Sequence, residues 1–182
     1  MLLKQKAKQI AKASNVHEIF AILQKYLESY IDYELLKHLI EKFGDNTLKQ
    51  KMKKYEDEFE KFASKTSIDI FSHITEDLCE IQQFQQVTIV LKKDSASVTL
   101  KEACAFKASL AKHSGVYNDS MYFKSMGTQS VSLTLAVPLS ALELIIPALD
   151  EEFRAEHSIT SVTIDGKPLE NIDDVYLQVS NF

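Results

Sequence analysis

The chain has 182 residues, 45% of them hydrophobic, and a net charge of −5, which is too apolar a composition for a disordered protein. No apolar run approaches the roughly 18 residues that a membrane span needs, and the Lys-rich start MLLKQKAKQIAKAS lacks the apolar core of a signal peptide. We therefore expect a soluble, cytoplasmic protein.

The charge is unevenly distributed. Residues 1–66 carry 13 Lys and 10 acidic residues, whereas residues 67–182 carry 8 basic and 16 acidic residues. The acidic second half should repel nucleic acid, and the single arginine, Arg154, leaves little capacity for bidentate phosphate recognition. Two cysteines, Cys79 and Cys104, do not form a disulfide framework.

The first half has the pattern of short, capped helices. A Lys-rich helix is expected over residues 4–13, and a second follows Asn15 as N-cap. A third runs from Asp32 to Gly44, where glycine suits a left-handed C-cap. The fourth carries a heptad-like apolar stripe made by Leu48, Met52, Tyr55, Phe59 and Phe62, and Ser67 should cap a fifth. Short loops between these helices predict an antiparallel helical bundle over residues 1–82.

The second half alternates strands and helices. After a polar junction at 82–86, a strand is expected from Val87, a capped helix from Thr99 to Gly115, and a short strand at 121–124. The clearest strand is 129–137, where Val131, Leu133, Leu135 and Val137 alternate with small residues, and Pro138 ends it. A helix that Pro147 kinks or splits, a strand at 160–164 and a last strand at 175–179 complete the pattern. The order predicts an α+β protein whose residues 86–182 form a ferredoxin-like βαββαβ domain with an extra C-terminal strand.

Catalytic and ligand-binding motifs are missing from the sequence. There is no G-x-S-x-G turn, no Gly-rich phosphate loop and no His or Cys spacing that suits a metal. Cys104 and His113 are nine residues apart on one helix, about 13 Å, which is too far for a direct pair. We therefore expect no enzyme activity, no cofactor and no metal. RNA binding by the open sheet face is also disfavoured, because its central-strand positions are Ser and Thr.

Two groups of residues are candidates for protein contacts. Tyrosines are enriched at binding hot spots, and four of them gather on the helical half: Tyr26, Tyr30, Tyr33 and Tyr55. Half-buried packing is the alternative interpretation of these four. On the open face of the central strand, Ser132 and Thr134 should be exposed, with Ala136 beside them on the same face.

Three stretches carry a family resemblance: YELLKHLIEKFGDNTLKQKMKKYEDEFEKF at 33–62, TLKEACAFKASLA at 99–111 and MGTQSVSLTLAVP at 126–138. They resemble a poorly characterised helical plus α/β module of large invertebrate intracellular proteins that also carry death-fold, NACHT, ankyrin or Roco-type GTPase domains. The resemblance implies a signalling or scaffold context and no catalytic residues.

Two functions follow as hypotheses. The first is a non-enzymatic adaptor or oligomerisation module that binds a protein partner or itself in intracellular signalling. The alternative is a small-molecule sensor that binds a metabolite in the α/β domain or in the cleft between the two halves.

Overall fold

The computed structural model describes residues 33–71, 84–93, 98–127 and 130–169. Their elements follow in the order α3 (Glu34–Phe43), α4 (Asn46–Ala63), the 3-10 turn η1 (Ile68–Phe71), β1 (Phe84–Leu91), α5 (Leu100–Ser114), the 3-10 turn η4 (Asn118–Ser120), β2 (Tyr122–Gly127), β3 (Val131–Pro138), α6 (Leu139–Ala148), α7 (Glu151–Glu156), β4 (Ile159–Ile164) and β5 (Lys167–Pro168). None of the described helices combines the length and apolar character that crossing a bilayer requires.

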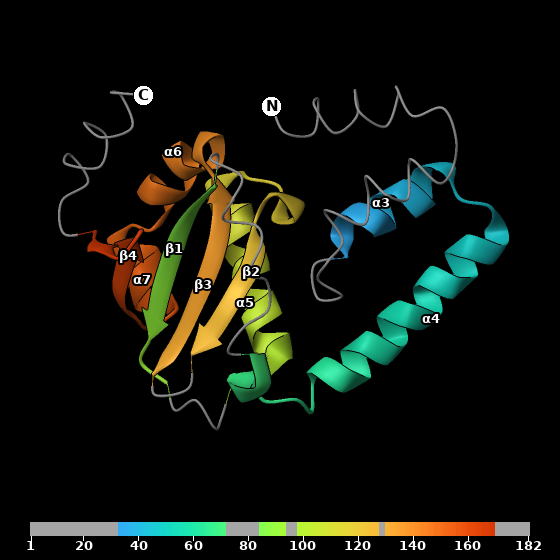
Figure 1. Ribbon diagram of the computed structural model, residues 1–182, viewed down its shortest axis with the longest axis horizontal. Coiled ribbons are helices and arrows are strands. Elements are labelled where there is room, and N and C mark those ends of the chain that lie inside the picture. The colour runs from blue at the N-terminus through green and yellow to red at the C-terminus, as the bar shows by residue number, and fades with distance from the viewer. Residues whose placement is uncertain (1–32, 72–83, 94–97, 128–129, 170–182) are drawn as a thin grey trace.

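A five-stranded sheet organises the second half. Its strand order is β2-β3-β1-β4-β5, and all neighbouring strands are antiparallel. Helices α5, α6 and α7 lie together behind the sheet in Figure 1, so one face of the sheet carries the main core. The predicted α+β character is therefore present, and from β1 onward the strands and α-helices follow in the order β1, α5, β2, β3, α6, α7, β4 and β5.

The predicted central strand is confirmed as β3. Its alternating residues Val131, Leu133, Leu135 and Val137 are fully buried in the main core. Period-two alternation places them on the face that α5 and α6 cover. Each fully buried side chain of this size contributes about 1.5–3 kcal/mol of transfer free energy, which makes β3 a principal source of stability.

The opposite face of β3 differs from the expectation. Ser132 is half-buried, but Thr134 and Ala136 are buried, so the predicted exposed polar strip is wrong at these two positions. Ala136 lies in a second, smaller cluster with Phe84 of β1 and Tyr122 of β2, whose rings meet edge to face at 6.0 Å. The hydroxyl of Thr134 lies 3.1 Å from that of Thr88 on the neighbouring strand.

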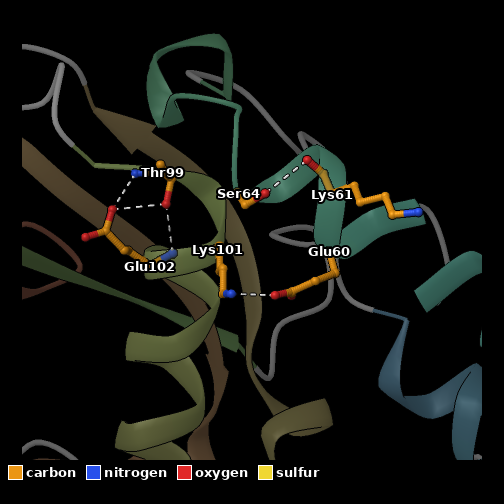
Figure 2. Close-up of polar contacts among 6 residues, drawn as sticks. All are labelled: Glu60, Lys61, Ser64, Thr99, Lys101 and Glu102. Carbon is orange, nitrogen blue, oxygen red and sulfur yellow. Dashed lines mark hydrogen bonds and ion pairs between the residues drawn. The ribbon is translucent and has the colours of Figure 1, made fainter. Parts of the chain in front are cut away.

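Helix α5 begins at the predicted capping box. The Thr99 hydroxyl accepts a hydrogen bond from the Glu102 amide, and the Glu102 carboxylate accepts one from the Thr99 amide at 2.8 Å (Figure 2). This hydrogen bond from the Thr99 amide is the main cause that lowers the pKa of Glu102. At the other end Gly115 adopts φ 69°, the left-handed conformation expected of a C-terminal glycine.

Replacing Thr99 with Ala should lower the free energy of unfolding by about 1 kcal/mol, because the Glu102 amide then loses its acceptor. Urea denaturation of the variant beside the wild type measures this. A Thr99→Ser variant keeps the acceptor and should recover most of the loss. An equal loss in both variants would contradict the role of the hydroxyl.

The predicted splitting of the helix near Pro147 is confirmed. The apolar pattern that continues from Leu139 to Phe153 forms two helices, α6 and α7. Pro147 lies inside α6, and Asp150 starts α7 by accepting a hydrogen bond from the Phe153 amide at 2.8 Å. Asp150 thus has a structural role as the N-cap of α7. The backbone bond to Phe153 is the main cause that lowers the pKa of the Asp150 carboxyl.

Two local expectations, on Gly44 and on the junction at 82–86, were wrong. Gly44 ends α3 in an extended conformation, φ −75° and ψ 146°, and not in the left-handed one. Glycine is needed there because a Cβ would come within 2.5 Å of the Ile40 carbonyl oxygen. Residues 84–86 of the predicted junction belong to β1. The helix expected after Ser67 starts with a 3-10 turn at 68–71, and the rest of the stretch expected to form it lies outside the described residues.

The main core extends across the predicted boundary at 82–86. Ala63, Ile68 and Phe71 belong to the same cluster as the strands, and Ser67 forms a β-bridge with Thr99. The division into two domains stays a prediction. The helices expected before residue 33 and the strand expected at 175–179 lie outside the described residues, and the observed fifth strand is the short β5 that follows the Asp165-Gly166 turn.

Candidate interaction surface

The hairpin of α3 and α4 is the part of the described structure that stands apart from the sheet (Figure 1). Its turn is specified locally. Gly44 allows the close approach to Ile40, and the Asp45 side chain caps α4 by accepting from the Leu48 amide at 2.8 Å. At about 1.5 Å per residue, α3 is about 15 Å long and α4 about 27 Å, so α3 covers only part of its longer partner.

An aromatic cluster locks the two helices together. Tyr33 meets the rings of Tyr55 at 5.1 Å and Phe59 at 5.3 Å, both edge to face, and Tyr55 stacks on Phe59 at 6.2 Å. Such pairs add about 0.5–1.5 kcal/mol each beyond the area they bury. An ion pair between Lys37 and Glu56 joins the same two helices, and its hydrogen bond raises the pKa of Lys37.

The environment of Tyr33 has a measurable consequence. Burial, followed by the nearby carboxylates of Glu56 and Glu34, raises the pKa of Tyr33 from 10 to about 12. The folded state therefore holds this proton more tightly than the unfolded state. The stabilisation is complete below pH 10 and should be lost as the pH rises through about 12. In Tyr33→Phe this alkaline loss should be absent.

Urea denaturation of both proteins at neutral pH and at a pH between 10 and 12 tests the prediction. If the wild type and Tyr33→Phe lost the same free energy between the two pH values, Tyr33 would not be held in this cluster. Tyr117, which is largely exposed, supplies the control substitution Tyr117→Phe.

Polar contacts attach the hairpin to the α/β part. Asn118 of η4 donates to Glu34 at 2.7 Å, and His38 lies 3.7 Å from the buried Asp119. At the far end of α4, Glu60 pairs with Lys101 of α5, and the Ser64 hydroxyl donates to the Lys61 carbonyl at 3.1 Å (Figure 2). These contacts hold the hairpin at α3 and at the C-terminal end of α4.

The predicted apolar stripe of α4 is covered only in part. Met52 is buried and Phe59 packs against the main core. Leu48 and Phe62, at the two ends of the stripe, are 45% and 42% exposed, and Phe43 at the end of α3 is 73% exposed. Leu48 and Phe62 are thus the accessible ends of a stripe whose middle packs inside the molecule. Exposed apolar residues grouped on one element are typical of interaction sites.

The structure separates the predicted contact residues into two places. Tyr33 and Tyr55 are half-buried in the hairpin cluster, so they pack inside the molecule, as in the alternative interpretation. Tyr26 and Tyr30 lie outside the described residues. Ser132 and Thr134 belong to the sheet face opposite α5 and are not near-neighbours of the hairpin in the fold. The roles of these residues in recognition stay predictions.

The side chains that could take part in catalysis form contacts between structural elements. His113 pairs with Asp150 at 3.5 Å and not with Cys104, and the Ser109 hydroxyl lies 3.1 Å from His157 Nε2. Lys107 is fully buried and donates to the Met121 carbonyl at 3.1 Å, a contact that no sequence pattern indicated. Within the described ranges, no three His, Cys, Asp or Glu side chains converge to hold a metal ion.

A cavity of about 270 Å³ opens between the start of α5 and the turn from α7 to β4. It combines apolar and titratable side chains, among them Leu91, Phe106, Leu133, Lys93, Glu102 and His157. Its size suits a small organic molecule better than a protein segment. Sequence reasoning missed this site because its residues come from four separate stretches of the chain.

No family model, no curated protein and no solved structure matches this chain.

Proposed function

We propose that this chain is a non-enzymatic protein–protein interaction module of intracellular signalling. In this proposal the α/β part is a ferredoxin-like domain, the preceding helices form a bundle, and the α3–α4 hairpin is the contact surface. The observation that supports it best is the exposure of Phe43, Leu48 and Phe62 on one hairpin that is otherwise locked and capped. Apolar side chains on a rigid element bind at low cost in conformational entropy.

Capture from an extract of the source cells, with the chain immobilised, tests the role of the hairpin. The wild type is compared with the double variant Leu48→Ala and Phe62→Ala, and with Leu144→Ala on α6 as the matched control. Leu144 is 51% exposed but belongs to another surface. We expect a stoichiometric partner, or the chain itself, to lose at least tenfold in recovery with the double variant and to be unaffected by the control. Identical recovery with all three proteins would contradict the proposal.

The cavity beside α5 supports a second function, the binding of a small molecule with an apolar body and a charged group. Ala105 lines this cavity and is exposed, so Ala105→Trp should fill the mouth without disturbing the core. In a thermal-shift screen, a genuine ligand should raise the melting temperature of the wild type and not that of Ala105→Trp. A screen in which no compound distinguishes the two proteins would count against this function.

A further inference from the structure

We propose that α4 pairs antiparallel with α4 of a second copy of this chain, across a two-fold axis near Tyr55. This inference rests on the proposed function, because it names the partner that the hairpin surface binds. It follows from the positions of the exposed apolar residues and from the order of the charges along α4.

One flank of α4 has a heptad repeat that is exposed at its two ends and half-buried at its middle residue, Tyr55. Leu48, Tyr55 and Phe62 are spaced by seven residues, so they lie within about 40° of one another around the helix. Lys51 and Glu58 each follow a member of this series by three residues and lie beside it, and both are exposed. Leu48 and Phe62 mark the two ends of the flank and are both nearly half exposed.

The charges of α4 are segregated by half. Its first half carries Lys49, Lys51, Lys53 and Lys54, and its second half carries Glu56, Asp57, Glu58 and Glu60, with Lys61 as the one cation of the last turn. Within one helix this order is unfavourable, because Lys precedes Glu in the i,i+4 pair of Lys54 and Glu58, and cations near the N-terminus oppose the helix dipole. The arrangement therefore has little value for the isolated helix.

The same order of charges is favourable when a second α4 packs antiparallel to the first. With the two-fold axis near Tyr55, Leu48 of one copy lies opposite Phe62 of the other, since each is seven residues from the axis. Lys51 of each copy then faces Glu58 of the other, and the basic half of each helix lies along the acidic half of its partner. A parallel pair would place like charges together, so the charge order selects the antiparallel pair. Such a contact is isologous and closes as a dimer.

The size of the surface sets the expected affinity. A contact that involves one helix of about 27 Å per copy buries less than the roughly 1,200 Å² of standard stable complexes. The dimer should therefore be weak, with a dissociation constant on the order of 10–100 μM. It should also weaken when the ionic strength rises from about 0.05 M to 0.5 M, because exposed charges are then screened.

Sedimentation velocity over a concentration series tests the pairing with charge reversals. Lys51→Glu alone and Glu58→Lys alone each place like charges opposite one another twice per dimer, so each should raise the dissociation constant about tenfold or more. An equimolar mixture of the two variants restores opposite charges at both contacts, and so does the double variant Lys51→Glu, Glu58→Lys. Both should return to near the wild-type dissociation constant. Lys167→Glu, at the far edge of the sheet, is the matched control and should leave it unchanged.

Three results would overturn the inference: a wild type that stays monomeric up to millimolar concentration, a dimer that neither reversal weakens, or reversals whose mixture does not reassociate. A monomeric wild type whose Leu48 and Phe62 double variant still loses a captured partner overturns this inference alone. If the double variant also captures the same proteins as the wild type, the proposed function falls with it.

Discussion

Replacing Phe153 with Ala is expected to lower the free energy of unfolding by about 3–5 kcal/mol, the range of Phe truncations in well-packed cores. Phe153 is almost fully buried in α7, and its ring packs on three others. The centroid distances are 4.3 Å to His157, 5.0 Å to His113 and 6.1 Å to Phe106. The side chain thus joins α7 to α5, and the cavity left by its removal would lie between them.

Urea denaturation measures this loss, and Phe62→Ala is the matched control. Both substitutions remove the same atoms, but the Phe62 side chain is 42% exposed on α4. We expect the control to cost only about 1 kcal/mol, because much less apolar surface is returned to water. Equal losses in the two variants would show that Phe62 is buried, which would also remove the surface on which the proposed contact depends.

The second large loss of stability is expected from a substitution on the sheet face opposite α5. Ala136→Lys should cost about 3 kcal/mol or more, because a long charged side chain would enter a site with no accessible surface between Phe84 and Tyr122. Ser132→Lys lies on the same strand and the same face but is half-buried, so it should cost about 1 kcal/mol or less. Thermal denaturation of the two variants compares them. Equal and small effects would mean that this face is open to solvent, as the sequence pattern alone suggested.

The difference at Ala136 shows where sequence reasoning ends. The alternation in β3 correctly predicts both the strand and the face that carries Leu133 and Leu135. It contains no information on the residues that cover the other face, because only strand pairing in the folded sheet brings Phe84 of β1 and Tyr122 of β2 next to Ala136. A small residue such as alanine is compatible with either an open or a covered face. Only the register of the three strands decides between them.

Helix ends were predicted well where the signal is local. Thr99 and Glu102 are three residues apart and form the expected capping box, and Gly115 at the other end of α5 adopts positive φ. Gly44 was misinterpreted because glycine also serves where the backbone passes close to another atom, here the Ile40 carbonyl oxygen. Sequence alone does not distinguish these two uses of glycine.

The sequence predicted the apolar stripe of α4, but not which residues of that stripe are buried and which are exposed. The 4-3-4-3 spacing correctly indicates one apolar stripe, and Met52 at its centre is buried. The stripe does not indicate how long the covering helix is. Leu48 and Phe62 at the ends of the stripe are accessible, whereas Tyr33 and Tyr55, two of the tyrosines first suggested for recognition, hold the hairpin together. The candidate site therefore moved from the tyrosines to the apolar ends of the same helix.

Native mass spectrometry of the wild-type chain over a concentration series is the direct test of self-association through α4. We expect a monomer at low concentration and a dimer, of twice the chain mass, whose fraction increases with concentration. The dimer fraction should be smaller in Phe62→Ala. A monomer at every concentration would contradict self-association through α4. An equal dimer fraction in Phe62→Ala would contradict the assignment of the surface.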